Sequence, residues 1–448
     1  MKALEEHKKI LKDIADLSFS YGYDNSSIDF SEIDNLDEIS KEKKEEFIHS
    51  CHEGYKLAQN KLVDEILSYQ DLQISKKPKL KEARRQRDEE LEEIITNELK
   101  IIEQRLKTFS HIADGIAWQL IGGEIHIAKR FYLQEKGQKR LKESNIDHAI
   151  KVAKEINKDP NNFALISDIT NFIQIGDLLV VSEGTIGIME LKQGKVNKQI
   201  TEFLARLKKD KKKIEDVNIK QKFDKRTAKQ VKRVARQQKR MQQVSDLINN
   251  DEGIDPVTGT NLTINTPAFD MQYFHENLEK LHLELKDEIW SYDVIEGCIH
   301  VGMYKDKGLM MAPFAIKQII SQDTDNYLVV DWMSIVNNIS EPIFAKPFDP
   351  NFIIDVLTGG VRVIFGIDFD KLIELFCNVG LPTDWVSEKE TMKFKQRSKH
   401  KPFEINKRAI LMKTDDQEIY FGGGLISKMI YDNIKPSSLA MSMLYTQK

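Results

Sequence analysis

The chain has few of the residues and runs on which several classes of protein depend. Its three cysteines, Cys51, Cys298 and Cys377, are far apart and form no CxxC pair, which argues against a disulfide or zinc scaffold. No run approaches the roughly 18 to 20 apolar residues of a membrane span, and the charged N-terminal segment has no secretory apolar core. We therefore expect a cytoplasmic protein with no membrane partner.

Motifs of several common enzyme classes are also missing. The sequence contains no GxGxxG fingerprint, no GxxxxGK[S/T] loop and no serine or cysteine nucleophile motif. The formal net charge of −4 does not by itself indicate a nucleic-acid partner. A length of 448 residues, of which 40% are hydrophobic and 31% charged, predicts a soluble globular chain of two or three domains.

One stretch near the middle of the chain carries a chemical pattern. Asp177 opens the apolar run 178–181, and a second apolar run, 186–189, ends at Glu190 and Lys192. Two β-rich runs around a glycine-containing turn predict a hairpin. Period-2 alternation puts Glu190 and Lys192 on one face of the second strand. Strand pairing brings Asp177 towards that face in a register that the sequence leaves open.

Two carboxylates and a lysine are what a divalent-metal phosphodiesterase needs. Asp177 and Glu190 offer hard oxygen ligands to Mg²⁺, for which Mn²⁺ can substitute. Lys192 can position water or stabilise charge in the transition state. The alternative is a hairpin edge with surface charges, because acid-x-Lys triplets also occur in polar helical stretches such as 42–44 and 98–100. The hairpin context favours the catalytic interpretation.

Asp177, Glu190 and Lys192 in this context resemble the PD-(D/E)xK nuclease superfamily over about residues 109–251, with Gly176 in the place of its proline. The resemblance implies an α/β fold with a restriction-endonuclease-like core, a mixed sheet flanked by helices. Many members donate one more acid from a preceding helix, and the candidates for an additional acid are Asp114, Glu124 and Asp168. The competing interpretations are a helix-surface residue, a cap-region acid and turn chemistry, respectively.

A strongly basic region follows the hairpin. Between Lys195 and Arg240 there are 18 Lys/Arg and 5 Asp/Glu, a local charge of 18 − 5 = +13. Helical spacing predicts an apolar face on the sheet and a cationic face, whose natural partner is a phosphate backbone. In the superfamily the equivalent helix often carries Gln, Arg or Lys towards the scissile phosphate. The nucleic-acid-binding candidates are Lys195, Lys229, Lys232, Arg233, Arg236, Gln237 and Arg240, with Arg236 and Gln237 the first choices.

The sequence predicts three regions. Residues 1–108 form a helical region that ends in a long charged helix between Pro78 and about Thr108. Residues 109–251 form the nuclease-like core, in which a buried helix breaks at two glycines, 122–123. A turn-rich linker, 251–260, leads to a mixed α/β domain, 261–448, of unknown role.

Three functions remain open at this point. The leading hypothesis is a metal-dependent nuclease that acts on DNA in preference to RNA. The resemblance suggests genome (antiviral) defence, with a homo-oligomer or a partner subunit left open. The rivals are a catalytically inactive nucleic-acid-binding or scaffold protein on the same fold, and a regulatory protein whose basic segment binds acidic partners.

Overall fold

The computed structural model describes residues 2–30, 39–132, 141, 145–182, 184–192, 195–209, 219–250, 252–254, 259–263, 269–335, 340–398, 401–413 and 417–445. The chain is mixed α/β and divides into two compact units. The central unit spans Lys9–Asn265, and the C-terminal unit joins Met1–Lys8 to Thr266–Lys448. No helix within the described ranges is long and apolar enough to cross a membrane.

Helices make up the first part of the central unit. They are α1 (Leu4–Phe19, from Lys9 onwards), α2 (Tyr21–Asp24), α3 (Lys41–Gln86), α4 (Glu89–Leu120), α5 (Ile125–Phe131) and α6 (Ile146–Ile156). The predicted break after α4 is confirmed, because Gly122 and Gly123 both have positive φ. The core of this part includes Ile102, Phe109 and Ile112 of α4, each fully buried.

The helix boundary predicted at Pro78 is wrong, because α3 continues through this residue to Gln86. The chain reverses at Arg87, which is left-handed, and Asp88 then caps α4 by accepting from the Leu91 amide at 3.0 Å. An interior proline costs about 3 kcal/mol, and packing of α3 along α4 offsets that cost. The Lys76–Glu98 ion pair at 2.6 Å is part of this packing.

Helix α4 also crosses the boundary expected between residues 108 and 109. The expected N-terminal helical region and the expected nuclease-like core lie largely in one compact unit, since that unit runs from Lys9 to Asn265. The boundary expected at 251–260 lies close to the division at Asn265. Part of that linker is not simple turn, because β4 (Glu252–Ile254) pairs with β5 (Asn261–Thr263).

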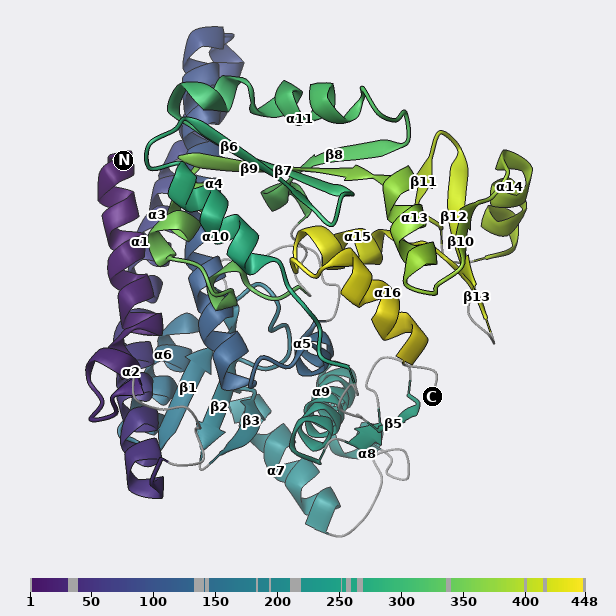
Figure 1. The fold of residues 1–448 in the computed structure, drawn as a ribbon. Helices are drawn as coiled ribbons and strands as arrows, with labels where there is room; N and C mark the ends of the chain where they lie inside the picture. Colours follow the sequence, from purple (N-terminus) through teal and green to yellow (C-terminus); the bar gives the residue numbers. More distant parts are fainter. Residues whose placement is uncertain are drawn as a thin grey trace. The chain divides into compact units, whose positions relative to one another are not determined.

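A three-stranded sheet lies at the centre of this unit (Figure 1). Strands β1 (Asn162–Ile166), β2 (Leu178–Ser182) and β3 (Thr185–Met189) pair in that order, so the predicted hairpin is confirmed. Both pairings are antiparallel, so the described strands do not form the mixed sheet that was expected. The connections explain this, because a parallel pair needs a long crossover and β1 reaches β2 through 11 residues with only a short 3-10 turn.

Amide side chains seal both edges of this sheet. On the β1 edge, Gln59 of α3 donates to the Ala164 carbonyl at 3.0 Å and accepts from the Ile166 amide at 2.8 Å. On the β3 edge, Asn249 accepts from the Ile186 amide at 3.1 Å and donates to its carbonyl at 3.0 Å. Each amide substitutes for a neighbouring strand, so the sheet presents fewer unpaired backbone groups for aggregation.

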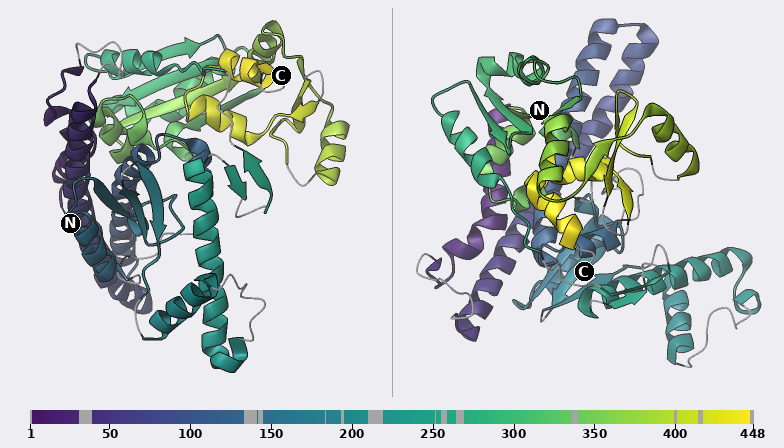
Figure 2. Two further views of the ribbon diagram at one scale, coloured as in Figure 1. Left: turned by 90° about the horizontal axis from the view of Figure 1, so that it is seen from below. Right: turned by 45° about the vertical axis from the view of Figure 1, so that its right-hand side comes forward.

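The basic region forms three helices, α7 (Lys195–Lys209), α8 (Ile219–Lys222) and α9 (Lys225–Asn250). Figure 2 shows α9 in teal as a long helix beside the sheet. The predicted apolar face of α9 is confirmed, but only part of that face packs against the sheet. Ala228, Val231 and Val234 pack on α7 and α8 instead, and the second half of the helix contacts β3 and β4.

The C-terminal unit contains two further antiparallel sheets. The larger sheet has the order β6 (Trp290–Ile295), β7 (Ile299–Lys305), β9 (Val361–Asp368) and β8 (Tyr327–Asp331). The smaller sheet pairs β12 (Arg408–Lys413) with β10 (Thr383–Trp385), β11 (Glu404–Ile405) and β13 (Glu418–Tyr420). The helices are α10 (His275–Glu284), α11 (Ala312–Ile320), α12 (Pro350–Thr358), α13 (Phe369–Asn378), α14 (Glu388–Arg397), α15 (Gly423–Ile430) and α16 (Pro436–Tyr445).

Candidate active site

The register of the hairpin places Asp177 opposite Glu190. Leu178 pairs with Met189, so the residues one step beyond this pair face each other at the end of the sheet. The Asp177 amide donates to the Met189 carbonyl at 2.8 Å, and its own carbonyl accepts from the Ser167 amide at 3.0 Å. Asp177 is therefore held on both sides by the neighbouring strand ends.

The Asp177 carboxylate reaches across the end of the hairpin. Its Oδ2 accepts from the Leu191 amide at 2.5 Å, between the other two residues of the pattern. Burial, and then the charges of Glu190 and Asp168, raise the pKa of Asp177, while the Leu191 amide and Lys192 lower it. The negative charges of Glu190 and Asp168 are thus close enough to act on the Asp177 carboxylate.

Glu190 and Lys192 lie side by side, as the alternation predicted, although β3 ends at Met189 and both residues follow the strand. The Lys192 ammonium forms an ion pair with Glu190 Oε1, and the two side chains are only 17% and 18% exposed. Gln237 of α9 joins them, since its Oε1 accepts from Lys192 Nζ at 3.2 Å and its Nε2 lies 3.4 Å from Glu190 Oε1.

Gly176 is required by the backbone at this point. Its φ of +77° lies in the left-handed region and is closed to proline. A Cβ at this position would lie 2.4 Å from Ile188 Cγ2 and 3.1 Å from the Met189 carbonyl oxygen. The close approach lets Asp177 pair with the end of β3.

The three additional acids have different surroundings. Asp168 lies in the 3-10 turn after β1, and its charge acts on Asp177. Asp114 is buried in α4, where its two oxygens accept from the amide and the side chain of Asn171 at 2.7 and 2.6 Å. Glu124 is the exposed N-cap residue of α5. Of the three, Asp168 is the one whose charge is felt at the Asp177 carboxylate, and Asp114 holds the loop that leads to it.

Helix α9 carries eight Lys/Arg and no Asp/Glu between residues 225 and 240. All eight side chains are exposed except Arg240, which is half-buried. At about 100° per residue, Arg233 and Arg240 lie within about 60° of Gln237, whereas Lys232 and Lys239 are on the opposite side. The helix therefore presents one group of cations beside Gln237 and another away from it. Lys195 begins α7 and is exposed.

The donor set suits a hard divalent cation. Asp177 and Glu190 face each other, and the charge of Glu190 raises the pKa of Asp177, so a bound cation would relieve their repulsion. No group of three or more His, Cys, Asp or Glu side chains is arranged to hold a metal ion within the described ranges. The carboxylate pair would thus supply two side-chain ligands.

Several residues around this site were not predicted. Asn249 and Ser245 hold α9 against β3 through Ile186, and Asn171 holds Asp114. Amide and hydroxyl residues are common on helix surfaces and in loops, so nothing in the sequence distinguishes these. Gln237 was predicted to face a phosphate, and its contact with Lys192 depends on a helix that begins 33 residues further along the chain.

Comparison with known proteins adds no relative. No protein-family model, no curated protein and no solved structure matches this chain.

Proposed function

We propose that this protein is a divalent-metal-dependent nuclease that hydrolyses phosphodiester bonds, in DNA in preference to RNA. One observation carries the proposal: Asp177 lies opposite Glu190 at the end of an antiparallel hairpin, with Lys192 and Gln237 in direct contact beside them. In this proposal the hairpin belongs to a core of the restriction-endonuclease type. The three residues flank the ends of two paired strands, Asp177 before β2 and the other two after β3, so the fold brings them together.

Asp177 and Glu190 are the residues that would hold the metal. When bound, Mg²⁺ or Mn²⁺ supplies positive charge to offset that of a phosphate and lowers the pKa of a coordinated water. Lys192 is held by Glu190 and Gln237, so its ammonium needs little reorganisation to bind a phosphate oxygen or orient a water molecule. The low exposure of this pair strengthens its electrostatic effect on a bound phosphate.

The basic helix supplies the nucleic-acid surface in this account. Arg233 and Arg240 lie on the same face as Gln237, so they are the cations best placed to bind phosphates next to the scissile bond. Arg236 and Lys229 follow at the margin of this face. Each neutralised phosphate releases condensed counterions, which favours binding at low salt. Genome defence is the biological role that fits such a nuclease with a large C-terminal unit.

A catalytically inactive binding or scaffold protein is the second candidate. The Lys192–Glu190 ion pair favours it, because the lysine already neutralises one carboxylate of the proposed pair. Such a protein would bind nucleic acid through α9 and would not cut it. A divalent cation and Lys192 would compete for Glu190 in the active protein, so metal dependence separates the two candidates.

The test is a cleavage assay on single-stranded, duplex and supercoiled DNA and on RNA, each in Mg²⁺, Mn²⁺ or EDTA. The wild type should cut in either metal and not in EDTA, and Lys192→Ala should reduce the rate at least about 100-fold. Lys209→Ala, at the exposed end of α7, is the matched control and should retain the wild-type rate. Tight binding without cleavage by the wild type would favour the scaffold.

A further inference from the structure

A cavity lies on the opposite edge of the same sheet from β3, where α3 and α6 meet β1. Its volume is about 240 Å³, which would hold about eight water molecules at roughly 30 Å³ each. The lining residues come from all three elements and all belong to the central unit. None of the residues of the candidate active site lines it.

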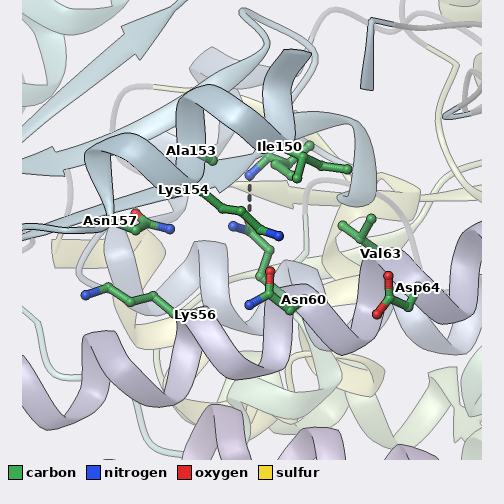
Figure 3. A pocket seen from close by; sticks show the side chains of 10 residues that line it. Lys56, Asn60, Val63, Asp64, Ile150, Ala153, Lys154 and Asn157 are labelled. Atoms are coloured by element: carbon green, nitrogen blue, oxygen red, sulfur yellow. Dashed lines mark hydrogen bonds between the residues drawn. The ribbon is translucent and has the colours of Figure 1, made fainter. Parts of the chain in front are cut away.

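The two ends of the cavity carry different charged residues. Figure 3 shows Lys56 and Asn157 at one end, with Val63 and Asp64 at the other. Lys154 of α6 also lines it, so two ammonium groups from different helices reach the same space. Figure 3 shows Lys154 between these two ends, so the positive charge is spread along the cavity, where a small anion can neutralise it.

Lys56 is sheltered but weakly paired. Its side chain is 14% exposed, and its ion-pair partner, Glu53, is 3.8 Å away and 52% exposed. An ammonium removed from water needs a close counter-charge, and this partner is both distant and solvated. Lys154 is exposed, so water solvates its ammonium until a ligand binds. Asp64 is the one acid among the described residues that line the cavity, so the two lysines leave its lining with a net charge of 2 − 1 = +1.

Asn157 adds an oriented donor. Its Oδ1 accepts from the Ala164 amide at 2.7 Å, which fixes the carboxamide and leaves the two N–H groups of Nδ2 for another acceptor. Gln59, by contrast, uses both ends of its amide on the edge of β1. Two ammonium groups and an anchored amide offer hydrogen-bond donors to the cavity, which is the chemistry that binds the oxygens of a phosphate group.

We infer that this cavity binds a small phosphate-bearing molecule, with the phosphate at Lys56, Lys154 and Asn157 and a compact body towards Val63. Asp64, at the far end, offers an acceptor for a hydroxyl or amino group of that body. The inference goes beyond the proposed nuclease activity and does not rest on it, since the two sites share no residue.

Isothermal titration calorimetry of the full chain tests the inference, with inorganic phosphate and adenosine monophosphate as probes at constant ionic strength. Saturable binding of either probe is expected. Lys56→Gln and Lys154→Gln should each weaken it at least 10-fold. Lys61→Gln and Lys151→Gln remove the same charge from exposed positions of the same helices outside the cavity and should leave the affinity unchanged.

Asn157→Asp provides a variant that keeps the fold. The new carboxylate still accepts from the Ala164 amide but puts a negative charge in place of the donor, so binding should be lost while the melting temperature is retained. Tighter binding of the nucleotide than of phosphate would identify a nucleotide as the ligand class, and the reverse would identify free phosphate. No saturable binding, or an equal loss in Lys151→Gln, would overturn the inference.

Discussion

Lys192 Nζ donates a hydrogen bond to Gln237 Oε1 at 3.2 Å, which joins the hairpin to the basic helix 45 positions later. The same glutamine is 3.4 Å from Glu190 Oε1, so one side chain touches both members of the ion pair. This contact brings the candidate chemistry and the candidate nucleic-acid surface together. Loss of the contact should therefore affect turnover as well as binding.

Gln237→Ala should lower kcat for DNA cleavage about 10-fold and change KM little. The reason is that Lys192 loses the neutral partner that orients it, while the cations of α9 remain. Gln238→Ala is the matched control, because Gln238 is the exposed neighbour on the same helix. Equal rates for the two variants in single-turnover assays would show that Gln237 has no positioning role.

The two faces of α9 should differ in their effect on cleavage. A double variant of Arg233→Gln and Arg240→Gln should reduce kcat/KM more than Lys232→Gln with Lys239→Gln, although both lose two charges. The slope of log K against log salt for duplex DNA should also become less steep by up to about 1.8 with the first pair, at about 0.9 per phosphate contact. Equal effects of both pairs would indicate non-specific attraction only.

Gly176→Ala should destabilise the central unit by about 1–3 kcal/mol, because a side chain is strained at this φ and its Cβ would clash with Ile188. Urea unfolding measures the change. Gly187→Ala, within β3, is the control, since a Cβ there would lie 3.8 Å from the Val180 carbonyl oxygen, an ordinary van der Waals distance. Similar midpoints for both variants would contradict the proposed reason for glycine at 176.

Asp114 should make stability depend on pH. Burial raises the pKa of this carboxyl from 3.8 to about 7, against the opposing effect of the Asn171 and Phe172 donors. Between these values the native state keeps a proton that the unfolded state releases, so stability falls as pH rises from about 4 to 7 and is level above that. The full span corresponds to about 4 kcal/mol at most.

The Asp114→Asn variant lacks this titration, so its stability compared with that of the wild type at each pH measures the effect. The variant should be less stable than the wild type at pH 5, because an amide cannot accept from both Asn171 donors, and the difference should shrink towards pH 8. The comparison is needed because burial also lowers the pKa of His111 to about 4, which contributes the opposite slope in both proteins. A difference in melting temperature that is constant with pH would contradict the buried, protonated state.

Local patterns predicted the elements that carry the site. The hairpin follows from apolar alternation around a turn, and α9 follows from valine spacing that the structure confirms at Val231, Val234 and Val244. In the N-terminal helices, the rule that proline ends a helix failed at Pro78. Packing along α4 and the cap at Asp88 place the break ten residues later. Propensity is a weak guide where tertiary contacts decide.

The sequence patterns did not predict the geometry of the site. Alternation put Glu190 and Lys192 together, but only the pairing of Leu178 with Met189 shows that Asp177 lies opposite Glu190. No sequence pattern predicted the roles of the edge amides Gln59 and Asn249, since each forms hydrogen bonds with a strand more than 60 positions away. Such long-range contacts depend on how helices pack against the sheet, which no local pattern encodes.

The most direct test of the central claim is the rate of Mg²⁺-dependent DNA cleavage by Asp177→Asn beside the wild type. Asparagine keeps an oxygen to accept from the Leu191 amide, so the hairpin should remain folded while one of the two carboxylates is lost. The account predicts cutting by the wild type and a loss of at least about 100-fold in the variant. Equal rates of cutting by the two proteins would contradict the assignment of this hairpin as the active site.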